Sequence, residues 1–414
     1  MKTNIKMIAL VIALSMAATG CASINDAESS SADASYGASA SADSSASSLP
    51  IENVADTADD YTDRDLEQTA DTDVSQEITV SDGQTVTITQ AGTYILSGTA
   101  SNCTVRVEAD KENDKIQIVL NGVSITNESA PAIYVVSADK CFITTAEGTE
   151  NSLAVTGSFT ADGDTNTDAV IYSKDDLVLN GLGSLDISSS DNGISCKDDL
   201  KVTGGSYTIT SSSDAVEAND SILICDGSFV INTGKDAFHA ENDEDNTSGC
   251  IEISGGTFDI NAASDGIQGT SYVKIDGGEM TITAAEGIEA TCVYINDGTI
   301  SITASDDGIN ASSKSQAFSP YIEINGGTLT IVMGQGDTDA IDVNGSVVVN
   351  GGYIDITAQV SSFDYDNTAE YNGGTIIING EEVSEIPQSM MGGRGGMGGD
   401  MGGNMGGRGG RGGW

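Results

Sequence analysis

Apolar and polar residues alternate in short segments throughout the middle of the chain, and the same segments recur. One phrase reads Gly205-Ser-Tyr-Thr-Ile-Thr, and it returns as Gly278-Glu-Met-Thr-Ile-Thr and Gly352-Tyr-Ile-Asp-Ile-Thr. A second phrase precedes it, as in Leu200-Lys-Val and Val273-Lys-Ile. A period of two is typical of a strand with one buried face. The pattern predicts many short strands and no helix.

The spacing of the repeat limits the fold further. The glycines that open the first phrase are 20 to 29 residues apart: Gly205, Gly227, Gly256, Gly278, Gly298, Gly327, Gly352 and Gly374. Propeller blades need about 40–50 residues, and a sandwich would not repeat one inward phrase in the same register. We therefore predict an all-β fold over residues 78–387, a right-handed parallel β-helix, which is a solenoid of about 22-residue rungs.

A third, more polar phrase lies between the other two, as in Asp214-Ala-Val-Glu-Ala and Asp307-Gly-Ile-Asn-Ala. Its apolar residue and the small residue two places later point inward, so the residue between them faces solvent. The outward residues are Ser195, Glu217, His239, Gln268, Glu289, Asn310 and Asp342. Stacked rungs would place them in one column, a polar face for a linear ligand.

An acidic residue precedes the small residue of this phrase, at a corner of each rung. These residues are Asp214, Asp236, Asp265, Glu286, Asp307 and Asp339. Two unit charges one rung apart repel by about 3–4 kcal/mol at an effective dielectric constant of 20. Ca²⁺ takes six to eight oxygen ligands, which carboxylates and carbonyls of adjacent rungs can supply. We predict that these residues bind Ca²⁺; a solvated acidic column without a fixed ion is the alternative.

The net charge of −47 narrows the range of partners. A field of this sign repels nucleic acid and anionic lipid, so we expect no nucleic-acid partner. The Arg-Gly-Gly segments near the C-terminus would otherwise suggest RNA binding. Residues 388–414 are expected to be a flexible tail rich in Gly and Met.

The N-terminus indicates export. Residues 1–20 have a basic start and an apolar run, which is typical of a secretory signal. They lead into Ala18-Thr19-Gly20-Cys21, which resembles the lipidation site of bacterial lipoproteins, although a plain signal peptide would begin in the same way. Residues 21–77, rich in Ser, Ala and Asp, are predicted to be a tether. We expect a protein lipid-anchored through Cys21 to the outer face of the bacterial membrane, with no other membrane contact.

Several side chains offer chemistry beyond charge. Tyr294 lies between inward Val293 and Ile295, so we expect it to face outward, where an aromatic ring can bind a neutral sugar. Lys235, beside Asp236, is a weak candidate for the base of a lyase. His239 is either a general acid/base or a polar residue that lines the face.

Two further patterns are predicted to be structural. Asn325, Asn350 and Asn372, each before Gly-Gly, are typical of an asparagine ladder that satisfies turn backbone. Six cysteines follow Cys21. Cys103 and Cys141 begin similar strands, and so do Cys250 and Cys292, but each pair is about two rungs apart, which favours buried free thiols over disulfides.

These phrases resemble the clostridial cellulose- and pectate-binding parallel β-helix family, whose members are similar in shape to polysaccharide lyases. The resemblance is carried by Gly92-Thr-Tyr-Ile-Leu-Ser-Gly, Val119-Leu-Asn-Gly-Val-Ser-Ile-Thr-Asn and Lys197-Asp-Asp-Leu-Lys-Val, within residues 78–385. It implies a right-handed β-helix, bound Ca²⁺ and binding of cellulose or acidic plant polysaccharide.

We therefore predict calcium-dependent binding of plant-wall polysaccharide, polygalacturonate or cellulose or both, at the cell surface. The residues expected to contact the polymer are Glu217, His239, Gln268, Glu289, Asn310 and Tyr294. A pectate-type lyase and a surface stalk or adhesin for a protein partner use the same fold and remain open.

Overall fold

The computed structural model describes residues 61–336 and 338–388, and every regular element among them is a β-strand. The described part of the chain contains no helix able to cross a membrane. The predicted signal peptide, the lipidation site Cys21, tether residues 21–60 and tail residues 389–414 lie outside the described residues.

Twelve short strands form one parallel sheet, which we call row three. They are β2 (Thr85–Ile88), β4 (Thr104–Glu108), β6 (Ile133–Ser137), β9 (Ala169–Ser173), β12 (Asn192–Cys196), β14 (Val216–Ala218), β16 (Phe238–Ala240), β19 (Asp265–Gly269), β22 (Glu286–Ala290), β25 (Ile309–Ala311), β28 (Asp339–Val343) and β31 (Ser361–Tyr365).

The other 22 strands form a second sheet. Its pairings divide it into two rows, which are joined because the 13-residue strands β5 (Lys115–Asn127), β13 (Asp199–Ser211) and β15 (Ser221–Thr233) belong to both. Row one also contains β7 (Lys140–Thr145), β10 (Leu177–Gly181), β17 (Cys250–Ile253), β20 (Tyr272–Ile275), β23 (Cys292–Ile295), β26 (Tyr321–Ile324), β29 (Ser346–Val349) and β32 (Ala369–Tyr371).

Row two carries the phrase that begins with glycine. It contains β8 (Glu150–Val155), β11 (Ser184–Ser189), β18 (Thr257–Ala262), β21 (Glu279–Ala284), β24 (Thr299–Ala304), β27 (Thr328–Met333), β30 (Tyr353–Thr357) and β33 (Thr375–Ile378). The first rungs add β1 (Ser75–Thr79) and β3 (Gly92–Ser101), and β34 (Glu381–Val383) follows β33.

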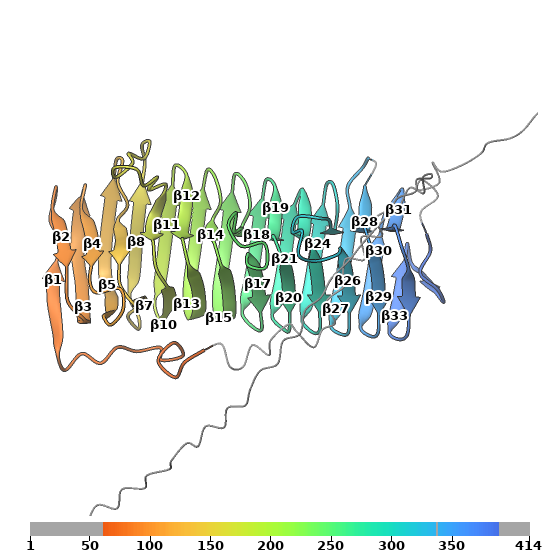
Figure 1. The fold of residues 1–414 in the computed structure, drawn as a ribbon, viewed down its shortest axis with the longest axis horizontal. Helices are drawn as coiled ribbons and strands as arrows, with labels where there is room; N and C mark the ends of the chain where they lie inside the picture. The colour runs from red at the N-terminus through yellow and green to blue at the C-terminus, as the bar shows by residue number, and fades with distance from the viewer. Residues whose placement is uncertain (1–60, 337, 389–414) are drawn as a thin grey trace, which may run out of the picture. The chain divides into compact units, whose positions relative to one another are not determined.

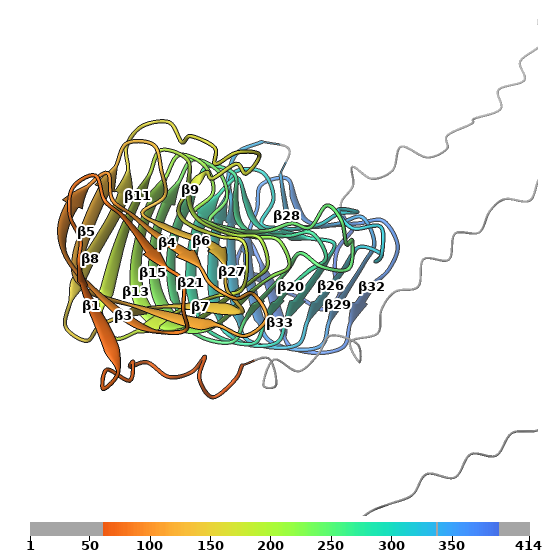
Figure 2. The ribbon, with the colours of Figure 1, turned by 60° about the vertical axis from the view of Figure 1, so that its left-hand side comes forward.

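The chain visits the three rows in turn and then returns one strand further along. For example, β20, β21 and β22 are followed by β23, β24 and β25, and each strand pairs in parallel with its counterpart. Figures 1 and 2 show successive strands of the sheets stacked side by side in chain order, for example β18, β21 and β24 in Figure 1. The pairings between named strands are parallel except β33 with β34. The predicted all-β fold of parallel strands is confirmed.

The inward positions of the three rows form one hydrophobic core. Like residues stack on like: the rings of Phe229 and Phe258 are parallel, with centroids 5.2 Å apart, and Tyr207 stacks on Phe229 at 5.1 Å. The six cysteines of the described residues are free, and four of them are buried. Burial of this continuous apolar stack is the main source of stability, because no single rung could bury its own inner face.

The turns between rows one and two are also repeated. The eight phrase glycines have φ between 76° and 132°, a backbone conformation that other residues rarely adopt. The predicted asparagine ladder is present beside them, because Asn350 donates to Asn325 at 2.8 Å and Asn372 donates to Asn350 at 2.9 Å. Its expected role is wrong in one respect: these amides bond to one another and not to the turn backbone of the described residues.

Residues 61–74, which we expected to belong to the tether, instead contact the outer side of row one. The carboxylate of Asp65 is buried and lies 3.3 Å from Nζ of Lys140. Gln68 donates to the carbonyl of Thr203 at 2.8 Å, and the guanidinium of Arg64 lies over the ring of Phe142. A few specific polar contacts hold this polar segment, which its composition does not reveal.

Candidate functional site

The predicted polar column exists on the outer side of row three. Strand register places Ser195, Glu217, His239, Gln268, Glu289, Asn310 and Asp342 directly opposite one another in successive strands. Their expected exposure is wrong at two positions, because Ser195 and Glu289 are 0% and 7% exposed. The other predicted column residues are half-buried. The column therefore lies recessed among its neighbours.

The acidic residues at the corner form a hydrogen-bonded ladder. The backbone N–H of Asp236 donates to Oδ1 of Asp214 at 3.0 Å, and that of Asp265 donates to Oδ1 of Asp236 at 2.8 Å. Asp339 donates in the same way to Asp307 at 3.1 Å. In each of these bonds one carboxylate oxygen accepts from a backbone N–H of the next rung. The carboxylates are therefore stacked beside the polar column.

Asp265, Glu286 and Glu289 form the first of three groups of potential metal ligands among the described residues, and Asp176, Asp198 and Asp199 form the third. The ligand oxygens of the first group lie within 4.8 Å of one another. Burial and the nearby carboxylates raise the pKa of Asp265 to about 8 and that of Glu286 to about 7. The ammonium of Lys314 contacts Glu289. An all-oxygen group with this excess of negative charge fits Ca²⁺, which these three side chains would hold.

The remaining predicted metal ligands are more dispersed. Among residues 61–336 and 338–388, Asp307 and Asp339 are not part of any group of three close ligands. Burial and Asp342 hold the pKa of Asp307 at about 7, although a backbone N–H bond from Asp339 opposes this shift. These two carboxylates continue the ladder, and no third donor completes a site there.

Asp214, Asp236 and His239 form the second group, with ligand atoms within 4.8 Å of one another. Nδ1 of His239 is 3.6 Å from Oδ2 of Asp214 and 3.7 Å from Oδ2 of Asp236. Burial disfavours the charged imidazole, but the carboxylates outweigh burial and raise its pKa. Calcium prefers oxygen ligands, so a group that includes an imidazole does not fit this ion. The predicted assignment of Asp214 and Asp236 to calcium is not supported by their surroundings.

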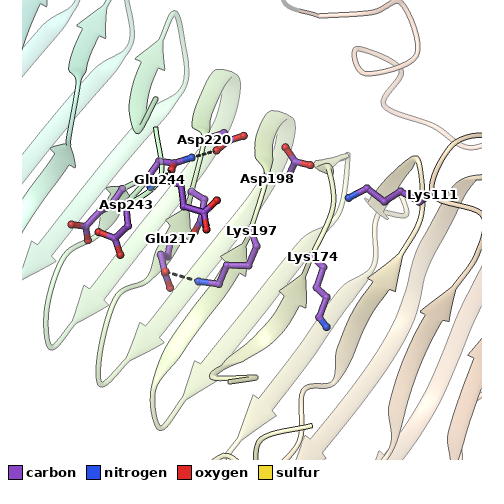
Figure 3. Close-up of a pocket in the computed structure, with 11 residues that line it drawn as sticks. Lys111, Lys174, Lys197, Asp198, Glu217, Asp220, Asp243 and Glu244 are labelled. Atoms are coloured by element: carbon purple, nitrogen blue, oxygen red, sulfur yellow. Dashed lines mark hydrogen bonds and ion pairs between the residues drawn. The ribbon is translucent and has the colours of Figure 1, made fainter. Parts of the chain in front are cut away.

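A groove of about 580 Å³ runs beside the column, between row three and row one. Figure 3 shows Lys111 and Lys174 on one side, Asp243 and Glu244 on the other, and Lys197 beside Glu217 between them. Nζ of Lys197 is 2.7 Å from Oε1 of Glu217. The groove therefore changes from basic to acidic along the direction in which the rungs stack.

Two insertions into the repeat, residues 241–249 and 312–320, extend this region. Residues 241–244 line the groove, and residues 241–246 line a second hollow of about 410 Å³, to which Lys314 and Gln316 also contribute. Oγ of Ser315 donates to the carbonyl of Asn246, which links the two insertions. When the amide nitrogen of Gln268 faces Asp236 at 3.0 Å, its oxygen accepts from Lys314.

The expectation that Tyr294 presents an exposed ring is wrong. The side chain lies off the apolar core but is only 3% exposed. It is flanked in register by Lys274 and Glu323, and its ring centroid is 6.1 Å from that of Tyr321. Burial raises its pKa. The alternation of residues along a strand shows whether a side chain points away from the core, but it does not show how far neighbouring side chains bury it.

Lys235, the weak lyase candidate, has an exposed side chain, and its Nζ is 3.9 Å from Oδ2 of Asp214. An ammonium in this ion-pair position does not present a free amine to a substrate. The geometry therefore offers it no role as a base.

Sequence reasoning did not identify the basic end of the groove. Lys174 and Lys197 each follow directly after a row-three strand, the position that Asn219 and Glu241 hold in the next two rungs. Alignment of the repeats at this position reveals the change from Lys to Glu. Asp198, also in the groove, has its pKa raised to about 6 by burial and by the carboxylates of Asp176 and Asp199.

The rows and the polar column define a repeat protein with one long polar face. Residues 82–338 match the family described as carbohydrate-binding domain-containing protein, and the chain belongs to this family. The family resemblance inferred from the sequence is thus confirmed.

Two comparisons show how much of this chain is similar to known proteins. A carbohydrate-binding domain-containing protein of Acetivibrio thermocellus is 40% identical over 124 residues, which cover 29% of this chain and 43% of the relative. The chain thus spans less than half the length of that protein. A solved structure described as the polysaccharide lyase-like protein from C. thermocellum, in a gadolinium derivative, is 24% identical and has a TM-score of 0.33. That match covers 74% of this chain and 96% of the solved one.

Proposed function

We propose that this protein binds an acidic plant-wall polysaccharide along the polar column of row three, and that Ca²⁺ assists binding. The observation that supports this proposal is the in-register column from Ser195 to Asp342, with the groove beside it. Stacked strands repeat every 4.7–4.9 Å, so a linear polymer meets one position of the column at each step. Membership of a carbohydrate-binding family supports the same ligand class.

The charge along the groove favours a uronic-acid polymer over a neutral one. Lys174 and Lys197 can pair with sugar carboxylates at the basic end. At the acidic group formed by Asp265, Glu286 and Glu289, a polyanion would be repelled unless a divalent cation bridged the two. A calcium ion there would neutralise the protein carboxylates and accept oxygens from the polymer.

We also propose the detailed architecture of the three rows and the place of the protein in the cell. We describe the three rows as a right-handed parallel β-helix with rungs of about 22 residues. The lipid on Cys21 would hold it at the outer face of the bacterial membrane, where it meets polymers too large to enter the cell. A lyase or a stalk for a protein partner is not favoured by any contact in the groove.

Co-sedimentation tests the proposal. The full chain is mixed with insoluble polygalacturonate or with cellulose, with Ca²⁺ or with chelator. We expect retention by polygalacturonate that falls at least tenfold in chelator. Equal retention in both conditions would contradict the calcium bridge, and release of unsaturated sugars would establish a lyase instead. D186N, at an exposed position of β11 in row two, is the matched control.

A further inference from the structure

Asp214, Asp236 and His239 are arranged differently from the all-oxygen group one rung away. The two aspartates are 4% and 6% exposed, and each gives its Oδ1 to a backbone N–H of the next rung. Their Oδ2 atoms are thereby turned toward Nδ1 of His239, at 3.6 and 3.7 Å. That nitrogen is buried and makes no hydrogen bond with the described residues.

These distances match the spacing of ligands around a small ion. Bonds of 2.0–2.2 Å from zinc to nitrogen and oxygen place tetrahedral ligand atoms about 3.4 Å apart. The observed spacings exceed this by only a few tenths of an ångström. Imidazole nitrogen and carboxylate oxygen both bind such an ion, and three protein ligands leave a fourth position open.

The other ring nitrogen has the partner that a ligating histidine needs. Nε2 of His239 is 3.5 Å from Oε2 of Glu241, the first residue after β16. A metal-bound histidine almost always directs its second N–H to a carboxylate or carbonyl, which fixes the ring. Glu241 is thus placed to orient the imidazole.

We infer that Asp214, Asp236 and His239 form a site for a divalent first-row transition metal ion such as Zn²⁺, distinct from the calcium site proposed at Asp265, Glu286 and Glu289. Lys235, whose exposed ammonium is 3.9 Å from Asp214, moves away when the ion binds. When its amide nitrogen faces Asp236, Gln268 of the following rung donates to Oδ2 of this aspartate at 3.0 Å. The fourth position takes water or an oxygen of a ligand in the polar column.

The chain contains one histidine, which gives a direct test. The full chain is labelled with ¹⁵N-histidine, and its ring nitrogens are followed by NMR during titration with Zn²⁺ and, separately, with Ca²⁺. We expect one equivalent of Zn²⁺ to shift the Nδ1 resonance, while millimolar Ca²⁺ leaves it in place. No polysaccharide is present, so the result is independent of the proposed function.

Variants locate the ion. In competition with a chromophoric chelator, H239Q and D236N should each lose at least tenfold in Zn²⁺ affinity, and D186N should lose none. An Nδ1 resonance that Zn²⁺ does not move, as when thiols or surface carboxylates take the ion, would overturn the inference. Equal Zn²⁺ affinity of H239Q and the wild type would also overturn it.

Discussion

The backbone N–H of Asp236 donates a 3.0 Å hydrogen bond to Oδ1 of Asp214, which holds the same position one repeat earlier in the chain. The bond links two successive rungs through a side chain, in addition to the backbone hydrogen bonds of the sheet. It also keeps two buried carboxylates close together, which an isolated pair in solution would avoid. The ladder is therefore both a structural element and a source of concentrated negative charge.

The ladder predicts a difference between two substitutions of Asp214. D214N keeps an oxygen acceptor for the N–H of Asp236, whereas D214A leaves this buried donor unsatisfied, at a cost of about 1–3 kcal/mol. Urea unfolding in chelator should show D214A clearly less stable than D214N. Equal losses for the two variants would mean that the hydrogen bond contributes little.

Calcium should stabilise the folded chain. A ligand that binds only the native state adds RT ln(1 + [L]/Kd), about 2.7 kcal/mol when the ion is at 100 times its Kd. We expect millimolar Ca²⁺ to raise the melting temperature, and Mg²⁺ to do less because it gives up its water reluctantly. E286Q should abolish most of this increase, and D186N should retain it. An unchanged melt after thorough chelation would instead indicate a solvated acidic column.

Without divalent cations, stability should fall as pH rises. Asp265 and Glu286 have pKa values raised to about 8 and about 7, well above their ordinary values of 3.8 and 4.5. The folded state therefore binds their protons more tightly than the unfolded state, and this contribution is complete only below about pH 4. It is lost as pH rises through 7 to 8. Melting curves in chelator between pH 5 and 8 should show the decline, and E286Q should reduce it.

The lysines at the basic end of the groove should contribute to binding of the acidic polymer and not to binding of cellulose. K174Q combined with K197Q should weaken retention by polygalacturonate several-fold and make the remainder less sensitive to salt, because screened ion pairs have been removed. K115Q, which does not line the groove, is the control. Cellulose binding should be unaffected. An equal loss for both polymers would indicate damage to the fold.

Asp65 should anchor residues 61–74. Its buried carboxylate faces Lys140, which is also largely buried. D65A removes the nearer partner of this ammonium and leaves it only Asp176, at 3.9 Å, so the variant should lose up to about 3–5 kcal/mol. Replacing both residues, as D65A with K140M, should recover much of the loss. Thermal unfolding of the single and double variants measures this coupling, and additive losses would contradict it.

The repeat made most of the architecture predictable. Alternation at Ile251, Ile253 and their counterparts identifies the inward side of each strand, and the interval between the phrase glycines identifies the partner strand. Because like residues stack in register, one correct rung predicts the others. The stacking of Phe229 on Phe258 follows directly from this rule.

The site was less predictable, because its properties depend on what lies across rungs and loops. Parity shows that Tyr294 and Glu289 leave the core, but not that neighbouring side chains and an insertion cover them. The column also places His239 between carboxylates of two rungs, a three-residue relationship that no single repeat contains. Asp65 was missed because its partner Lys140 is 75 residues away.

The last described strand has a consequence for the chain in concentrated solution. β34 is three residues long and antiparallel to β33, and its Glu381 and Glu382 are exposed. An open parallel edge of apolar strands is a template on which a second molecule can add its own strands and begin a fibre. A short, reversed and negatively charged strand offers a poor template. It thus protects the row-two edge at this end of the stack from edge-to-edge aggregation.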